Sequence, residues 1–239
     1  MEYSKTDTNQ LLRATKRHFH LLVGIQNEVS VKRPNRVLPL LTDLIFVALA
    51  FYSVLSYARS LVVFQQRQTL FFSISQVFIL LYLLMALSLL LVRRDAVVFS
   101  AKIVDYIYAL VALCSPMFFQ RVSGFGASIV GDSLELVGAV VVVGAFLSLN
   151  RSFGIAPENR GIRTTGMYRM VRHPMYSGYI LVETSIVLNN LSVLNVFILA
   201  MAAFFLVLRL QAEERLLKED PAYQVYAQKT SWKLVPFVF

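Results

Sequence analysis

The sequence predicts an all-α integral membrane protein with about four transmembrane helices and a C-terminal helical hairpin. Of its 239 residues, 57% are hydrophobic and 15% are charged, and the mean hydropathy is +0.62. Soluble domains have roughly 45–50% apolar and about 25% charged residues, so both values depart toward a membrane protein. The apolar residues also gather in long runs, and a helix needs about 20 of them to cross a bilayer. This composition excludes an ordinary soluble globule, a disordered chain and a disulfide scaffold.

Four apolar runs form the predicted transmembrane frame, which we place at residues 37–149. The expected spans are residues 37–57, 70–92, 103–119 and 129–149. A fifth apolar region, residues 176–208, is too long for one untilted crossing and is interrupted by the turn-type sequence Asn189-Asn190-Leu191-Ser192. It predicts a tight helical hairpin of two short helices whose ends return to the same side.

Basic residues are distributed unevenly between the loops. Of the 23 Lys and Arg residues, 20 lie in the N-terminal segment, the loop near residue 95, the loop 150–175 and the C-terminal segment. The remaining 3 lie in the two alternate loops. Because basic loops stay in the cytosol, the sequence predicts a multi-pass protein with both termini cytosolic. The same distribution accounts for the net charge of +9 without a nucleic-acid partner.

Residues 1–36 are predicted to form a basic cytosolic segment. Within it, residues 8–27 mix apolar and basic side chains, which fits either an interfacial amphipathic helix or a mobile basic tail. His18 and His20 are two residues apart and do not share a helical face, so we expect no metal site there. Cys114 is the single cysteine, which excludes an internal disulfide and a cysteine-based metal cluster.

Five acidic residues lie in or near the predicted spans. Three lie near span ends, where solvation is the expected explanation: Asp105, Asp132 and Glu135. Asp43 is ambiguous. Glu183 follows Tyr176 by seven residues and shares its helical face. We expect Glu183 either to line a substrate cavity or to be a neutral, hydrogen-bonded packing residue.

Two polar stretches, residues 151–174 and 209–236, flank the hairpin on the predicted cytosolic side. Since the two ends of a hairpin approach each other, we expect these stretches to be neighbours in space. Arg172 and His173 stand just before the first hairpin helix, because Pro174 suits a first helical turn. Helix N-termini attract anions such as carboxylates. The alternative is that Arg172, His173 and Tyr176 are interfacial anchors at a helix entrance.

Two further features of these stretches are candidates for function. Gly178 permits the close approach of another helix or of a ligand. Arg209 and Glu213 are four residues apart and share one helical face, whereas Glu214 points in a different direction. The alternative for these charges is a solvated helix end with surface ion pairs, which contribute little to stability.

The motifs occur in a recognisable order. The chain reads Thr165-Gly166-Met167-Tyr168, Arg172-His173-Pro174-Met175-Tyr176-Ser177-Gly178, the hairpin, Arg209-Leu-Gln-Ala-Glu213-Glu214, Tyr223 and Tyr226, and finally Lys233-Leu-Val-Pro236. This set resembles the isoprenylcysteine carboxyl methyltransferase superfamily over residues 150–239. The frame at residues 37–149 carries no specific match, so the acceptor stays open: a prenylcysteine-type carboxylate, or another membrane-partitioned carboxylate, thiol or amine.

The resemblance implies an integral-membrane methyltransferase that uses S-adenosylmethionine. It implies a cytosolic pocket covered by the C-terminal segment and a lipophilic acceptor that arrives from the bilayer. Contacts with the cofactor are implied for Gly166, Tyr168, His173, Tyr176 and Glu214. The helix start and the close approach described above add Arg172 and Gly178 as candidates for cofactor binding. Arg209 and Glu213 would lie near the reacting centre, and Glu183 is the candidate for substrate binding.

This chemistry agrees with the residues present. Methyl transfer is an in-line displacement at a sulfonium methyl, so the protein contributes positioning and desolvation and needs no metal. Glu213 or Glu214 could hold the ammonium of the cofactor, and Arg172, His173 and the helix N-terminus its carboxylate. Tyrosine faces could attract the sulfonium. Arg209 would orient a carboxylate acceptor, whereas a thiol or amine acceptor needs a base, for which Glu213 is nearest.

Two other functions stay open from the sequence. An NADPH-dependent membrane enone or sterol reductase has a related helical core and a cytosolic cofactor pocket, so the cofactor that binds would distinguish it. A small transporter or membrane scaffold without chemistry would have no cytosolic cofactor pocket.

Overall fold

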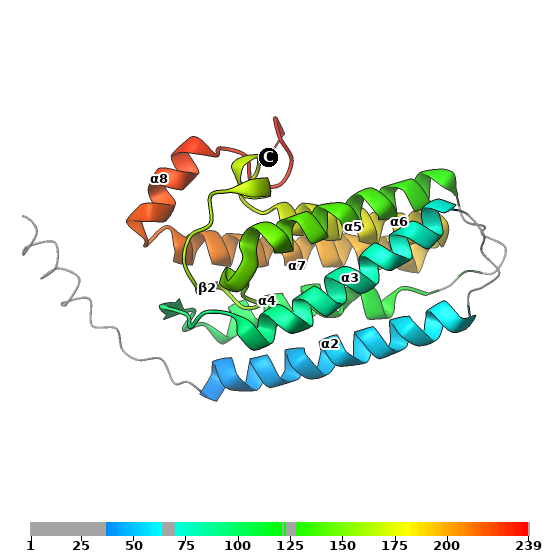
Figure 1. Cartoon of the computed structure of the whole chain (residues 1–239), viewed down its shortest axis with the longest axis horizontal. Coiled ribbons are helices and arrows are strands. Elements are labelled where there is room, and N and C mark those ends of the chain that lie inside the picture. Colours follow the sequence, from blue (N-terminus) through cyan, green and yellow to red (C-terminus); the bar gives the residue numbers. More distant parts are fainter. Residues whose placement is uncertain (1–36, 64–69, 121, 123–127, 239) are drawn as a thin grey trace, which may run out of the picture. The chain divides into compact units, whose positions relative to one another are not determined.

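The structure, a computed structural model, describes residues 37–63, 70–120, 122 and 128–238. Six long helices make up most of this part of the chain (Figure 1): α2 (Val37–Val63), α3 (Leu70–Val92), α4 (Ile103–Cys114), α5 (Ile129–Leu149), α6 (Pro174–Asn189) and α7 (Val193–Leu217). The short helix α8 (Pro221–Lys229) follows α7. The helix or tail predicted at residues 8–27, with its two histidines, lies outside the described residues.

Short polar side chains and prolines fix where several helices begin. The Ser128 hydroxyl accepts a hydrogen bond from the backbone N–H of Gly131 at 2.9 Å and caps α5. Ser192 caps α7 and Asp220 caps α8 in the same way, as is typical of these residue types. Pro174 occupies the first position of α6, as predicted, where its missing N–H leaves no intrahelical bond unmade.

The predicted spans agree with the helices to different degrees. The bounds of α3 and α5 coincide with the second and fourth spans, and α2 continues beyond the predicted end at Tyr57 to Val63. The third span is shorter as an α-helix than predicted, because α4 ends at Cys114 and a 3₁₀ turn, η1 (Ser115–Phe118), replaces its last turn. Pro116 lies in that turn and has no N–H to continue the α-helix.

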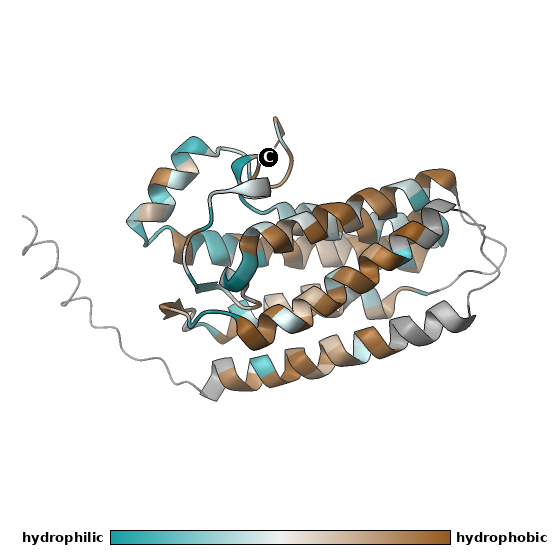
Figure 2. Cartoon of the chain, viewed as in Figure 1, coloured by the Kyte–Doolittle hydropathy of each residue, from teal (hydrophilic) through white to brown (hydrophobic). Residues whose placement is uncertain are grey.

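Two segments of the described chain are long and apolar enough to cross a membrane, Ile129–Ser152 and Val193–Leu217. Shorter apolar helices cover Leu40–Leu55, Gln76–Val92 and Ile103–Phe118. Hydrophobic residues predominate along α2, α3 and α5, whereas hydrophilic residues gather on α8 and the loops beside it (Figure 2). Large apolar side chains are exposed along these helices, including Leu44, Phe51 and Leu91. Such faces suit a hydrocarbon surround and not water.

The hairpin lies where the sequence predicts it, with α6 and α7 joined at residues 190–192. Asn195 is fully buried near this turn and makes three hydrogen bonds. Its side-chain amide donates to the carbonyl oxygens of Asn190 at 2.6 Å and Gln120 at 2.8 Å, and its oxygen accepts from the Gln120 N–H at 2.9 Å. These bonds satisfy backbone groups that would otherwise be unpaired inside an apolar region.

The most extensive helix–helix contact joins α5 and α6. Glycine makes this close approach possible: a Cβ atom added at Gly178 would lie 2.5 Å from Cγ2 of Val142 and 2.9 Å from the carbonyl oxygen of Gly138. Around this crossing, Phe146 and Leu210 are fully buried and connect α5 to α7. The crossing therefore supports the helix ends that carry the polar stretches.

Three acids near span ends are buried, and the expectation of solvation is wrong for them. Asp105, Asp132 and Glu135 are 1%, 1% and 7% exposed. Each accepts a hydrogen bond from a helix distant in sequence: Asp105 from Arg215, Asp132 from Asn189 and Glu135 from Gln76. Asp105 also accepts one from the nearby Ser100 hydroxyl. Covering elements and not solvent therefore surround these carboxylates. Asp43 forms an ion pair with Arg93.

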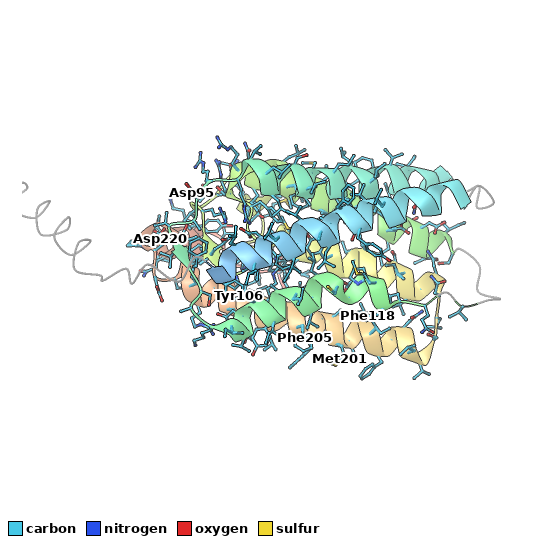
Figure 3. The ribbon with its side chains drawn as sticks, turned by 90° about the horizontal axis from the view of Figure 1, so that it is seen from below. Asp95, Tyr106, Phe118, Met201, Phe205 and Asp220 are labelled. Atoms are coloured by element: carbon cyan, nitrogen blue, oxygen red, sulfur yellow. The ribbon has the colours of Figure 1, made fainter. Side chains whose placement is uncertain are left out.

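Loops and short elements gather at one end of the helices. A two-residue strand, β1 (Val98–Phe99), pairs antiparallel with β2 (Glu158–Asn159), a feature that the all-α prediction did not include. The 3₁₀ turns η2 (Asn150–Ser152) and η3 (Gly166–Arg169) lie in the same connection. Figure 3 shows Asp95 and Asp220 together at this end, whereas Phe118 lies well along the helices from them. This polar end holds the candidate site.

Candidate active site

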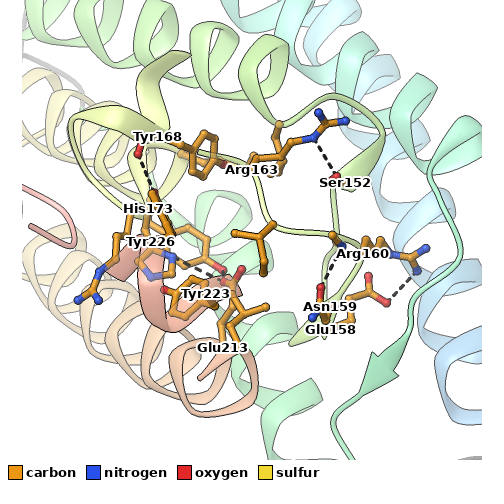
Figure 4. A pocket seen from close by; sticks show the side chains of 18 of the residues that line it. Ser152, Glu158, Asn159, Arg160, Arg163, Tyr168, His173, Glu213, Tyr223 and Tyr226 are labelled. Carbon is orange, nitrogen blue, oxygen red and sulfur yellow. Dashed lines mark hydrogen bonds and ion pairs between the residues drawn. The ribbon is translucent and has the colours of Figure 1, made fainter. Parts of the chain in front are cut away.

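A pocket of about 700 Å³, counted with its open mouth, lies at the polar end (Figure 4). One group of lining residues comes from η3, α6, α7 and α8: Tyr168, Arg172, His173, Tyr176, Arg209, Glu213, Tyr223 and Tyr226. A second group comes from the connection around β2: Ser152, Glu158, Asn159, Arg160 and Arg163. The two predicted polar stretches do meet here.

His173 is held by a carboxylate on α7. Its Nε2 lies 2.9 Å from Oε1 of Glu214, and the Tyr223 hydroxyl donates to the same oxygen at 2.6 Å. Nε of Arg172 lies 3.3 Å from it as well. Burial and the bond to Glu214 raise the pKa of Tyr223 well above its usual value, so this hydroxyl keeps its proton and donates. Glu214, which does not itself line the pocket, therefore holds three lining side chains in place: Arg172, His173 and Tyr223.

Arg209 and Glu213 flank Tyr176, one helical turn apart on α7. The guanidinium carbon of Arg209 lies 4.9 Å from the centre of the Tyr176 ring, and the Tyr176 hydroxyl donates to Oε2 of Glu213 at 2.6 Å. The His173 ring stacks on the other side of the cluster, 5.5 Å from the Tyr176 ring and nearly parallel to it. Nδ1 of His173 is 3.8 Å from Glu213. The charged groups of Arg209 and Glu213 therefore lie next to the aromatic rings of His173 and Tyr176.

The alternative of a solvated helix end does not fit these charges. Arg209 and Glu214 are each 4% exposed, and 28% of the Glu213 side chain is exposed. Nε of Arg209 is buried and has no hydrogen-bond partner among the described residues. Buried polar atoms normally have partners, and Arg209 lines the pocket, so this atom is a candidate for a ligand contact.

Helix α8 and its tyrosines close one side of the pocket. The Tyr226 hydroxyl donates to the carbonyl oxygen of Tyr168 at 2.7 Å, and the Tyr223 and Tyr226 rings lie 5.7 Å apart at 69°. Burial raises the pKa of Tyr168 well above its usual value, so its ring and hydroxyl stay neutral. A neutral aromatic wall of this kind suits a flat heteroaromatic ring.

Residues 232–234, which we name the strap, run beside the beginning of α6. The backbone N–H groups of Arg172 and His173 donate to the carbonyl oxygens of Trp232 at 2.9 Å and Lys233 at 2.8 Å. The Ser177 hydroxyl donates to the Leu234 carbonyl oxygen at 2.5 Å. The strap therefore occupies backbone N–H groups just before α6 and holds Arg172 and His173 against the pocket.

Four predicted site residues do not line the pocket. Gly178 lies in the α5–α6 crossing, and Glu214 lies behind His173. Gly166 has a φ of +62°, and a Cβ there would meet the Ser148 hydroxyl at 2.3 Å, so it serves the turn that carries Tyr168. Glu183 accepts a hydrogen bond from Ser115 at 2.6 Å, inside the bundle.

The residues around β2 were missed by sequence reasoning. Asn159 donates to Oδ2 of Asp220 at 2.8 Å, and Nε of Arg163 donates to the Ser152 hydroxyl at 3.1 Å. Burial raises the pKa of Glu158, whereas Arg160 and Arg93 counteract this shift. The density of basic residues at positions 160–163 is the one signal that could have drawn attention to this side of the pocket.

The lining predicts the kind of ligand that fits. Two carboxylates and four guanidinium groups line the pocket together with four tyrosines: Glu158 and Glu213, then Arg160, Arg163, Arg172 and Arg209, then Tyr168, Tyr176, Tyr223 and Tyr226. Such a lining suits a ligand with an aromatic ring and charges of both signs. The site can position and desolvate bound groups, which is what a group-transfer reaction without a covalent enzyme intermediate requires.

Comparison with known proteins defines the class. The family described as phospholipid methyltransferase matches residues 119–224, a range that includes α5, α6 and α7 and the start of α8. These elements supply the Arg172–Tyr176 and Arg209–Glu214 motifs. The chain is a methyltransferase, so the reductase and the non-enzymatic transporter or scaffold are set aside.

A curated relative has a similar sequence. Protein-S-isoprenylcysteine O-methyltransferase A of Arabidopsis thaliana is 28% identical over 160 residues, which cover 63% of this chain and 78% of the relative. This similarity supports the resemblance to the isoprenylcysteine carboxyl methyltransferase superfamily that the sequence motifs predict.

Proposed function

We propose that the protein transfers a methyl group from S-adenosylmethionine to the carboxylate of a lipophilic, prenylcysteine-type acceptor. The observation that carries the proposal is Arg209, a guanidinium that is 4% exposed, lines the pocket and has an unpartnered Nε among the described residues. A planar guanidinium suits two-pronged binding of a carboxylate. The Arabidopsis relative is named as a protein-S-isoprenylcysteine O-methyltransferase, which supports the same acceptor class.

The pocket suits the donor through its distribution of charge. Arg172 and His173 would hold the donor carboxylate, and Glu213, the more exposed of the two glutamates, would hold its ammonium. Glu214 is already bound by His173 and Tyr223, so we assign it to holding these side chains in place. Tyr168, Tyr223 and Tyr226 supply aromatic faces for the adenine.

When bound, the donor supplies an electrophilic methyl group on a positively charged sulfur. The residues of this chain then position the acceptor and exclude water. Arg209 orients the acceptor carboxylate, and the Tyr176 ring supports this guanidinium through a cation–π contact. A carboxylate acceptor has no proton to lose, so this reaction requires no base from the protein.

An amine acceptor is the second candidate, because the matched family is described as phospholipid methyltransferase. An amine must lose a proton on methylation, and Glu213 is the carboxylate placed to accept it, since it lines the pocket and is partly exposed. The two acceptor classes therefore make different demands on the pair Arg209 and Glu213.

We also propose a multi-pass topology in which both termini and the pocket face the cytosol. The 20-to-3 distribution of basic residues supports this orientation. The pocket lies at one end of the helices. The loop near residue 95, the loop 150–175 and the C-terminal segment gather at the same end. A water-soluble donor would reach the site from the cytosol.

The test is methyl transfer from labelled S-adenosylmethionine by protein purified in detergent. The acceptors to compare are S-farnesylcysteine with a free carboxylate, its amide, and phosphatidylethanolamine. We expect label on the carboxylate compound and none on its amide. Label on phosphatidylethanolamine alone would establish the amine candidate. Calorimetry that detects binding of NADPH and none of S-adenosylhomocysteine would refute the proposed donor.

A further inference from the structure

One short segment carries much of the wall of the pocket opposite His173. Residues 154–160, which we name the wall loop, include the lining residues Gly154, Glu158, Asn159 and Arg160. Strand pairing fixes its backbone: Val98 and Phe99 pair with Asn159 and Glu158. The wall loop is therefore anchored to the chain that follows α3, far from it in sequence.

A line of alternating charges connects the wall loop to helices α2 and α3. Arg93, just after the end of α3, pairs with Asp43 of α2 and lies 3.5 Å from Oε1 of Glu158. The other carboxylate oxygen of Glu158 lies 2.8 Å from Nη2 of Arg160, whose Nη1 donates to the Arg94 carbonyl oxygen. The side chains of Arg93, Glu158 and Arg160 are 9%, 5% and 6% exposed. Two positive and two negative groups thus balance in a largely dry space.

Gly154 shows how closely the wall loop fits around Glu158. A Cβ atom at position 154 would lie 2.5 Å from Oε1 and 2.7 Å from Cγ of Glu158. The end of a free glutamate could swing away at little cost. Here Arg160 donates a hydrogen bond to one carboxylate oxygen, and Arg93 lies at ion-pair distance, 3.5 Å, from the other. Movement of the carboxylate would therefore separate buried charges from their partners.

The wall loop also holds the opposite side of the pocket. Asn159 donates to Asp220, and Asp220 is the residue that caps α8. Helix α8 carries Tyr223 and Tyr226 to the pocket. A displacement of the wall loop would therefore move Glu158 and Arg160 on one side and the aromatic wall on the other.

We propose that Arg93 is a positioning residue for methyl transfer, which sets the shape of the donor pocket by holding Glu158. The inference rests on the proposed function, because the pocket in question is the proposed donor site. Arg93 itself does not line the pocket. Without it, Glu158 retains a single guanidinium partner in a buried place, where a carboxylate is poorly stabilised. Its side chain then turns or takes up a proton, and the wall loop relaxes with it.

The experiment measures the Kd of S-adenosylhomocysteine by calorimetry and the thermal unfolding temperature, both in detergent. We expect the Kd for Arg93→Met to rise at least tenfold. Arg93→Lys keeps the charge and should recover most of the affinity. At saturating donor, kcat should change less than the KM for the donor, because the reacting groups stay in place.

The matched control is Asp132→Asn, which removes the charge of a buried carboxylate that accepts a hydrogen bond from Asn189, away from the wall loop. Neither of these residues lines the pocket, so this variant should lose thermal stability and keep the wild-type Kd. Gly154→Ala is the second probe should Arg93→Met fail to fold, and it should weaken S-adenosylhomocysteine binding through the same carboxylate.

The outcomes separate the two proposals. A wild-type protein that does not bind S-adenosylhomocysteine would refute the donor itself. A wild-type protein that binds it, with unchanged affinity in Arg93→Met and Gly154→Ala, would overturn the positioning role alone. The role would also fall if Asp132→Asn weakened binding as much as Arg93→Met, since general loss of stability would then explain both.

Discussion

Arg209 is unusual among the cations of the chain in being almost fully buried without a carboxylate at ion-pair distance in the described residues. Its contact is the ring of Tyr176, at 4.9 Å from guanidinium carbon to ring centre. Burial of an unpaired charge is unfavourable unless a ligand or neighbouring groups compensate for it. A bound carboxylate would provide this compensation. We therefore expect the buried Arg209 charge to have a lower free energy with a ligand bound than without one.

Replacement of Arg209 tests whether its guanidinium group binds the acceptor carboxylate. Arg209→Lys keeps the charge but loses the planar two-pronged donor, so turnover should fall at least about tenfold, equivalent to about 1.4 kcal/mol of barrier. Binding of S-adenosylhomocysteine should fall less. The control is Arg215→Lys, an exposed arginine on the same helix that pairs with Asp105. Wild-type turnover in Arg209→Lys would remove the residue from the catalytic proposal.

Glu213→Gln distinguishes the acceptor classes. It keeps the size of the side chain and removes the charge. With an amine acceptor, turnover should fall at least about tenfold with little effect on donor affinity, since the proton acceptor is lost. With a carboxylate acceptor, the larger effect should be on the Kd of the donor, whose ammonium loses its partner. Measurement of both quantities for the same protein preparation decides between them.

The Tyr223 hydroxyl should matter through Glu214. Tyr223→Phe removes a 2.6 Å hydrogen bond to a buried carboxylate, and loss of such a bond costs about 1–3 kcal/mol. We expect a lower unfolding temperature and weaker S-adenosylhomocysteine binding, because His173 loses the fixed position of its partner. Tyr52→Phe, on the exposed side of α2, should change neither. Unchanged affinity in Tyr223→Phe would mean that Glu214 is held well enough by His173 and Arg172.

Among the helices, the crossing of α5 and α6 determines the position of the start of α6, and therefore of Arg172 and His173. Gly178→Ala would place a methyl group 2.5 Å from Val142, and overpacking of this kind usually costs about 1–3 kcal/mol. The unfolding temperature should therefore fall, while the folded fraction binds S-adenosylhomocysteine as the wild type does. A loss of affinity at unchanged stability would instead support the direct cofactor contact that the sequence pattern predicts.

The helices were the predictable part of the fold. The second and fourth spans could be placed to the residue because polar residues bound their apolar runs on both sides. Pro174 and the turn at Asn189–Ser192 located the hairpin, since these residue types restrict the backbone locally. Hydropathy could not show that α4 ends at Cys114, because Pro116 changes the hydrogen bonding without changing the apolar character of the run.

The candidate site was predictable only where local sequence controls it. Arg172, His173, Arg209 and Glu213 come from two helix ends that the hairpin must bring together. Glu158 and Arg160 depend on a two-residue strand pairing between distant loops, and nothing in a two-residue segment marks it as a strand. The partners of buried acids such as Asp105 are equally non-local, so a position near a span end was mistaken for exposure to water.

For the whole molecule, charge and hydropathy together predict the orientation in the membrane. In a Cys114→Ser background, a cysteine at Gly124 should react with an impermeant maleimide in intact cells. A cysteine at Gln228, an exposed position on α8, should react only after permeabilisation. The reverse labelling pattern would place the pocket on the other side and remove it from the cytosolic donor.

The strap has a consequence for how this protein can be observed. Trp232 is the single tryptophan of the chain, and its carbonyl oxygen accepts the hydrogen bond from the N–H of Arg172, a residue of the pocket wall. Its indole ring lies 5.6 Å from the ring of Phe237. The tryptophan fluorescence of the unlabelled protein, excited selectively at long wavelength, as is usual for tryptophan, therefore comes from a single residue bonded to the pocket wall. Titration with S-adenosylhomocysteine should shift the emission of Trp232, and the shift should disappear in His173→Ala. Occupancy of the pocket could then be followed in the native protein without a label.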